Sequence, residues 1–115
     1  MDPTTTSIFV FGIYLIFVGA GFLFIPNTIL PLFRFPKTEE PWIRVMAILI
    51  LIIAFFYLVG AHHRIVPIYW ATVIGRLFVF LSFLILILTK KAKPMLLAFG
   101  TIDLLGALWT LLTLI

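Results

Sequence analysis

The chain has 115 residues, of which 64% are hydrophobic and 10% are charged, whereas a soluble domain averages roughly 45–50% apolar and about 25% charged residues. This composition excludes a soluble globular enzyme domain and a disordered chain. It also excludes a nucleic-acid-binding module, because the basic residues behind the net charge of +4 lie between long apolar runs and form no basic face. The absence of cysteine excludes disulfides, thiolate metal sites, iron–sulfur clusters and Cys-attached haem.

A helix needs about 20 mostly apolar residues to cross the ~30 Å hydrocarbon core of a bilayer. Four segments meet this requirement: residues 7–25, 42–61, 66–89 and 94–115. Their apolar runs are continuous and do not alternate, unlike the strands of an outer-membrane barrel. The sequence therefore predicts an all-α, polytopic integral membrane protein, with a single domain over 1–115 folded as a bundle of four transmembrane helices.

The first span could instead be a signal peptide. A signal peptide begins with basic residues and has an apolar core of only 7–15 residues. Here Asp2 precedes the apolar run, no Lys or Arg does, and the run is longer. We therefore expect a helix of the mature protein.

The connection between the first two spans contains four prolines at five-residue spacing, Pro26, Pro31, Pro36 and Pro41. Because proline fixes φ and lacks a backbone donor, we expect an extended or loosely turned segment, lying on the bilayer surface or packed on the bundle. Thr38 is expected to cap the second helix, with Glu39 and Glu40 in its first turn near the positive end of the helix dipole.

Small residues recur along one side of each span, and helices in lipid associate through such residues. Ala47, Ala54 and Ala61 are spaced by seven in the second span, and Gly12 and Gly19 are spaced by seven in the first. The third and fourth spans carry comparable stripes. These stripes predict helix packing, with an internal cavity as the alternative.

Two ionisable residues lie deep in the spans. Arg76 is ~20 Å from the Thr89 end of the third span, and Asp103 is ~14 Å from the Pro94 end of the fourth. The two spans must be antiparallel neighbours because the loop between them is short, so we expect an inward-facing Arg76–Asp103 ion pair. Its surroundings are expected to include Thr72, Tyr69, Tyr57 or Thr110. The pair either fixes helix register or lines a polar pocket for a headgroup, an anion, a quinone or a proton.

Arg44 is a further candidate for the same site, as a second positive charge near the inner end of the bundle. Its alternatives are pairing with Glu39 or Glu40, or snorkelling to the interface. His62 and His63 point about 100° apart on a helix and therefore chelate one metal ion poorly, so we expect an interfacial pair, with pH sensing left open. No catalytic constellation is recognisable, and the sequence predicts neither an enzyme, nor a cofactor, nor a metal site.

Basic residues gather at one membrane side, at Arg34, Lys37, Lys90, Lys91 and Lys93, whereas the other side carries Arg64. By the positive-inside rule, the first and third loops are expected in the cytoplasm and both termini outside.

The segments PWIRV (41–45), TVIGR (72–76) and FGTIDLLGALWT (99–110) resemble a group of small bacterial four-helix membrane proteins that are broadly DoxX-like. The resemblance implies a four-helix bundle in the bacterial inner membrane, and some DoxX-like proteins are associated with quinone-linked redox systems. No motif in this chain carries such an activity.

The leading functional hypothesis is a small non-enzymatic membrane protein that binds a lipid-like or small anionic ligand near Arg76 and Asp103. The alternatives are a membrane-anchor subunit of a quinone-linked oxidoreductase and a homo-oligomeric channel or carrier. The expected partners are the lipid bilayer and a second copy or a membrane subunit, and no nucleic acid.

Overall fold

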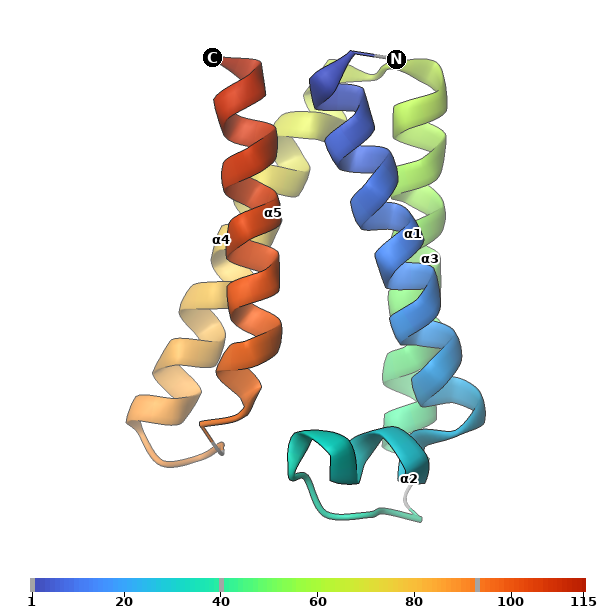
Figure 1. The fold of residues 1–115 in the computed structure, drawn as a ribbon, viewed down its shortest axis with the longest axis vertical. Helices are drawn as coiled ribbons and strands as arrows, with labels where there is room; N and C mark the ends of the chain where they lie inside the picture. Colours follow the sequence, from blue (N-terminus) through green and yellow to red (C-terminus); the bar gives the residue numbers. More distant parts are fainter. Residues whose placement is uncertain (1, 40, 93) are drawn as a thin grey trace.

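The computed structural model describes residues 2–39, 41–92 and 94–115. The four apolar runs fold into long helices, α1 (Pro3–Phe24), α3 (Trp42–His63), α4 (Val66–Leu88) and α5 (Leu96–Leu114). Each of the four is long and apolar enough to cross a membrane. Both termini lie at the same end of the molecule (Figure 1). The predicted all-helical, four-span membrane protein is thereby confirmed, and the described residues include no strand.

The four long helices form two pairs, α1 with α3 and α4 with α5 (Figure 1). The pairs meet where α1 contacts α5 and where the short turn between α3 and α4 joins them, at the end that carries the termini. Toward the opposite end the two pairs separate (Figure 1). The two pairs are therefore arranged in a V shape (Figure 1).

The predicted small-residue stripe of α3 is buried against α1. Ala47 and Ala54 are fully buried and Ala61 nearly so. On α1, a Cβ added to Gly19 would lie 2.8 Å from Leu51 Cδ2 and 3.2 Å from the Ala47 carbonyl oxygen. The backbones of α1 and α3 therefore approach closely because these positions lack bulk, as expected of helices that associate in lipid.

The connection after α1 differs from its prediction. It contains two short helices, α2 (Pro26–Ile29) and the 3₁₀ helix η1 (Leu30–Phe33), and Arg34 ends η1 with a φ of 62°. Pro26 is the first residue of α2 and Pro31 is the second residue of η1, and in the first turn of a helix a missing N–H leaves no intrahelical hydrogen bond unmade. Leu30 is buried, so the segment packs on the bundle.

The start of α3 also differs from its prediction. The N-cap is Pro41, with no side-chain cap, so neither Thr38 nor Glu39 belongs to the first turn. Instead, the Thr38 backbone N–H donates to Asn27 Oδ1 at 2.8 Å. The predicted position of Glu40 and the contribution of Lys93 to the basic side lie outside the described residues.

Helix α1 begins four residues earlier than expected because Asp2 caps it. The Asp2 carboxylate accepts a hydrogen bond of 2.7 Å from the Thr5 backbone N–H, and Pro3 follows at a position that tolerates proline. The same hydrogen bond from Thr5 holds the pKa of Asp2 below its ordinary value.

Candidate functional site

A cavity of about 720 Å³ lies between the two helix pairs, within the ~300–1,000 Å³ range of small-molecule sites. All four long helices line it, and most of its lining side chains are apolar. Along α3 the lining runs from Trp42 to Tyr57, a rise of about 22 Å. The charged side chains among the lining residues are Arg76 and Asp103. The cavity is therefore long and apolar, with two opposite charges on its wall.

Arg76 lies near the middle of α4 and is only 3% exposed. Its Nε donates to the Thr72 carbonyl oxygen at 3.1 Å. Its Nη2 donates to Thr72 Oγ1 at 3.1 Å and to Thr110 Oγ1 at 2.9 Å. Two of the predicted neighbours, Thr72 and Thr110, thus hold the guanidinium in place.

The other terminal nitrogen of Arg76, Nη1, is buried without a hydrogen-bond partner. A guanidinium carries five N–H donors, so the two on Nη1 are unsatisfied. The cation lies 4.7 Å from the Phe11 ring centroid and 5.7 Å from that of Tyr57, contacts that stabilise its charge but accept no hydrogen bond. A Cβ added to Gly106 would lie 3.0 Å from Nη1, so the missing side chain of Gly106 makes room for this nitrogen.

Hydroxyl groups extend the site to α1. Ser7 Oγ donates to the Thr4 carbonyl oxygen at 2.7 Å, and it also lies 2.7 Å from Thr110 Oγ1. Because the single Ser7 hydrogen is used by Thr4, Thr110 must donate to Ser7 while it accepts from Arg76. Nearby, Tyr69 bonds to Thr5 Oγ1 at 2.8 Å rather than to Arg76. These contacts join α1 to α4 and α5 at the end that carries the termini.

Sequence reasoning missed Thr5 and Ser7 as parts of this site. The signal available was the run of four hydroxyl residues at 4–7, which is unusual at the start of an apolar span.

The predicted Arg76–Asp103 ion pair is not formed. Among the described residues, Arg76 donates its side-chain hydrogen bonds to Thr72 and Thr110 and not to Asp103. Side chains on a helix lean toward its N-terminus. In α4 this direction leads toward the C-terminal end of the antiparallel α5, where Thr110 lies, and away from Asp103. Both charges nevertheless line the same cavity.

Tyr57 lines the cavity beside Arg76, but Arg44 does not. The exposed Arg44 donates from Nη1 to the Leu23 carbonyl oxygen at the end of α1, where a cation complements the helix dipole. It is therefore neither a second charge in the cavity nor, in the described structure, bonded to Glu39.

His62 and His63 are exposed, with their rings edge to face at 4.9 Å between centroids. No group of three or more potential metal ligands occurs within 2–39, 41–92 and 94–115.

No protein-family model, curated protein or solved structure matches this chain. The DoxX-like resemblance accordingly stays a prediction, and the functional argument rests on the residues themselves.

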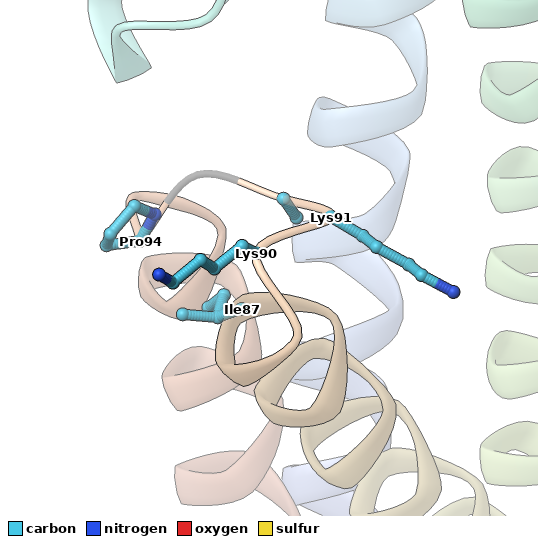
Figure 2. Close-up of a pocket in the computed structure, with 5 residues that line it drawn as sticks. Ile87, Lys90, Lys91 and Pro94 are labelled. Carbon is cyan, nitrogen blue, oxygen red and sulfur yellow. The ribbon is translucent and has the colours of Figure 1, made fainter.

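A second, shallower hollow of about 390 Å³ lies at the turn between α4 and α5 (Figure 2). Its lining includes Ile87, Lys90, Lys91, Ala92 and Pro94. The two lysine side chains point in different directions (Figure 2), so they do not converge on one ligand. This hollow supplies basic charge at the membrane boundary rather than a defined site.

The central position of Thr110 predicts a measurable loss of stability in Thr110→Val. Valine keeps the shape but removes the hydrogen bonds to both Arg76 and Ser7, and polar contacts between membrane helices are worth about 0.6 kcal/mol on average and up to about 1.7 kcal/mol. We expect the free energy of unfolding, measured in bicelles, to fall by about 1–3 kcal/mol. Thr113→Val is the matched control, because Thr113 bonds only to the carbonyl of Thr110 in its own helix. Equal effects of the two substitutions would contradict the network.

Proposed function

We propose that this chain is a small non-enzymatic membrane protein that binds a lipid-like ligand in the cavity between the two helix pairs, with the polar part of the ligand at Arg76 and Asp103. The observation that carries the proposal is the pair of unsatisfied N–H groups on Arg76 Nη1, beside a cavity whose walls are otherwise mostly apolar. A long apolar cavity with few polar groups is typical of a binding site for an amphiphile.

The energetic cost of the two charges supports the same proposal. A charge at the centre of a membrane helix costs about 2.5–3.5 kcal/mol on insertion scales. Arg76 and Asp103 do not offset this cost by pairing with each other. Ionisable residues in that position are candidates for a functional site, and a ligand that contacts both would lower the cost.

Native mass spectrometry of the chain released from mild detergent tests the proposal. We expect the wild-type protein to retain a small amphiphile and Arg76→Gln to lose most of it. Arg44→Gln, which removes an arginine outside the cavity, is the matched control and should retain the ligand. Wild-type protein that carries no small molecule would contradict the proposal, and a retained quinone with a co-purifying redox subunit would favour the anchor-subunit alternative. The same spectra report copy number, which tests the oligomeric channel alternative.

The same proposal includes a bacterial inner membrane with both termini outside. The orientation is supported by the basic residues that follow η1 and α4, at the end opposite the termini: Arg34, Lys90 and Lys91. Because the chain has no native cysteine, single cysteines can report the orientation. We expect His63→Cys to react with an impermeant maleimide added to intact cells and Lys91→Cys to react only after the cells are opened. The reverse pattern would invert the topology.

A further inference from the structure

We propose that the ligand is a zwitterionic phospholipid, whose phosphate binds Arg76 and whose ammonium group binds Asp103. This inference rests on the proposed function and specifies the chemistry of its ligand. It follows from the two charges on the cavity wall, their spacing and the apolar surface that continues beyond them.

The two charges select among ligand classes. Arg76 and Asp103 line the same cavity and share no ion pair. An anionic ligand would pair with Arg76 but be repelled by Asp103, and an uncharged ligand would leave both charges without an oppositely charged partner. A ligand with one negative and one positive group pairs with both, so that no charge in the apolar cavity stays uncompensated.

The spacing of the charges agrees with a compact headgroup. Arg76 Nη1 lies against Gly106, where an added Cβ would be 3.0 Å away. Asp103 precedes Gly106 by three residues in α5, and residues at that separation are neighbours on a helix surface, with about 5–6 Å between their Cβ atoms. The backbone position of Asp103 is therefore about one helical turn along α5 from the point where Arg76 Nη1 contacts this helix, so one compact headgroup spans the part of the cavity wall that carries both residues.

The remaining wall of the cavity points to a lipid rather than a free headgroup compound. The lining continues along α3 from Tyr57 to Trp42, about 22 Å, which is more than half of the ~30 Å hydrocarbon core. An acyl chain covers such a surface, whereas soluble phosphoethanolamine would leave it empty.

Access to Nη1 requires a local movement. Nη1 is buried, and the Phe11 ring packs beside it on Gly106, with its Cδ2 and Cε2 atoms 2.8 and 2.9 Å from an added Cβ. Phe11 also lines the cavity. Movement of this ring away from Gly106 is therefore part of the binding event that the proposal requires.

The experiment is a lipid competition followed by native mass spectrometry of the full chain. Phosphatidylethanolamine, phosphatidylglycerol and diacylglycerol with identical acyl chains are added in equal amounts to delipidated protein. We expect the wild-type protein to retain phosphatidylethanolamine at least about tenfold over each competitor, a difference of ~1.4 kcal/mol. Asp103→Asn removes the group that repels anions and should shift the preference to phosphatidylglycerol, while Lys91→Gln, outside the cavity, should change nothing.

The other possible outcomes contradict either the zwitterion inference alone or the proposed function as well. Equal retention of the three lipids, or a wild-type preference for phosphatidylglycerol, overturns the zwitterion inference and leaves the proposed function standing. Retention of none of the lipids overturns both. Displacement of bound lipid by soluble glycerophosphoethanolamine would assign the site to a headgroup compound instead. The wild-type comparison decides the inference even if a variant fails to fold.

Discussion

Gly106→Val is expected to destabilise the bundle by about 1–3 kcal/mol, the usual cost of overpacking a filled interior. A Cβ at this position would lie 2.8 Å from Phe11 Cδ2 and 3.0 Å from Arg76 Nη1. The added methyl groups must therefore push α1 away from α5, where the two helix pairs meet. Reversible unfolding in bicelles measures the effect.

Gly75→Val is the matched control for Gly106→Val. Gly75 lies in α4, and a Cβ added there meets no atom within 4 Å. Both substitutions change backbone propensity in the same way, so the difference between them isolates the packing contact. If both variants lost the same stability, the close approach at Gly106 would be unsupported.

Arg76→Leu is expected to fold while losing the ligand. Three hydrogen bonds at ~0.6 kcal/mol each and two cation–π contacts, with Phe11 and Tyr57, of about 0.5–2 kcal/mol each are lost. Against this, the variant no longer buries an arginine, which costs about 2.5–3.5 kcal/mol at a helix centre. The opposing effects offset each other in large part, so we expect the free energy of unfolding to fall by no more than about 3 kcal/mol and ligand retention to fall at least about tenfold. A variant that fails to fold would contradict this prediction.

The double variant with Asp103→Leu completes a mutant cycle. A direct ion pair would make each single substitution more harmful than the double, because each would leave one charge unpaired. In the structure Arg76 bonds instead to Thr72 and Thr110. We therefore expect the coupling energy between the two substitutions in delipidated protein to stay well below the ~3–5 kcal/mol that breaking a buried ion pair costs. A larger coupling would favour the pair that the sequence suggested.

The four long helices could be predicted from the sequence because a long, uninterrupted apolar run in a bilayer must satisfy its own backbone hydrogen bonds, which a helix does. The small residues of α3 also identified its buried face, since Ala47 and Ala54 are inaccessible. The segment after α1 could not be predicted from its prolines alone. Proline disrupts the interior of a helix but is well tolerated in its first turn. The spacing of the prolines in the sequence does not show whether Pro26 and Pro31 prevent a helix or begin one.

The sequence predicted several neighbours of Arg76, namely Thr72, Thr110 and Tyr57, but not the missing bond to Asp103. Counting residues placed Arg76 and Asp103 about one turn apart along the membrane normal. The direction of the Arg76 side chain, which leans toward the start of α4, brought it to Thr110 instead. The contribution of Ser7 required knowing that α1 packs on α5, a tertiary contact that no local pattern in either helix specifies.

The most direct test of the account is the distance between the Arg76 guanidinium nitrogens and the Asp103 carboxylate carbon in bilayers, measured by solid-state NMR with ¹⁵N and ¹³C labels. If a ligand rather than Asp103 satisfies Arg76, the dipolar coupling will be weak, with the groups beyond the ~4 Å of a direct ion pair. A strong coupling that places the two groups in contact would contradict the account, because the cavity would then hold a self-neutralised pair and no free charge for a ligand.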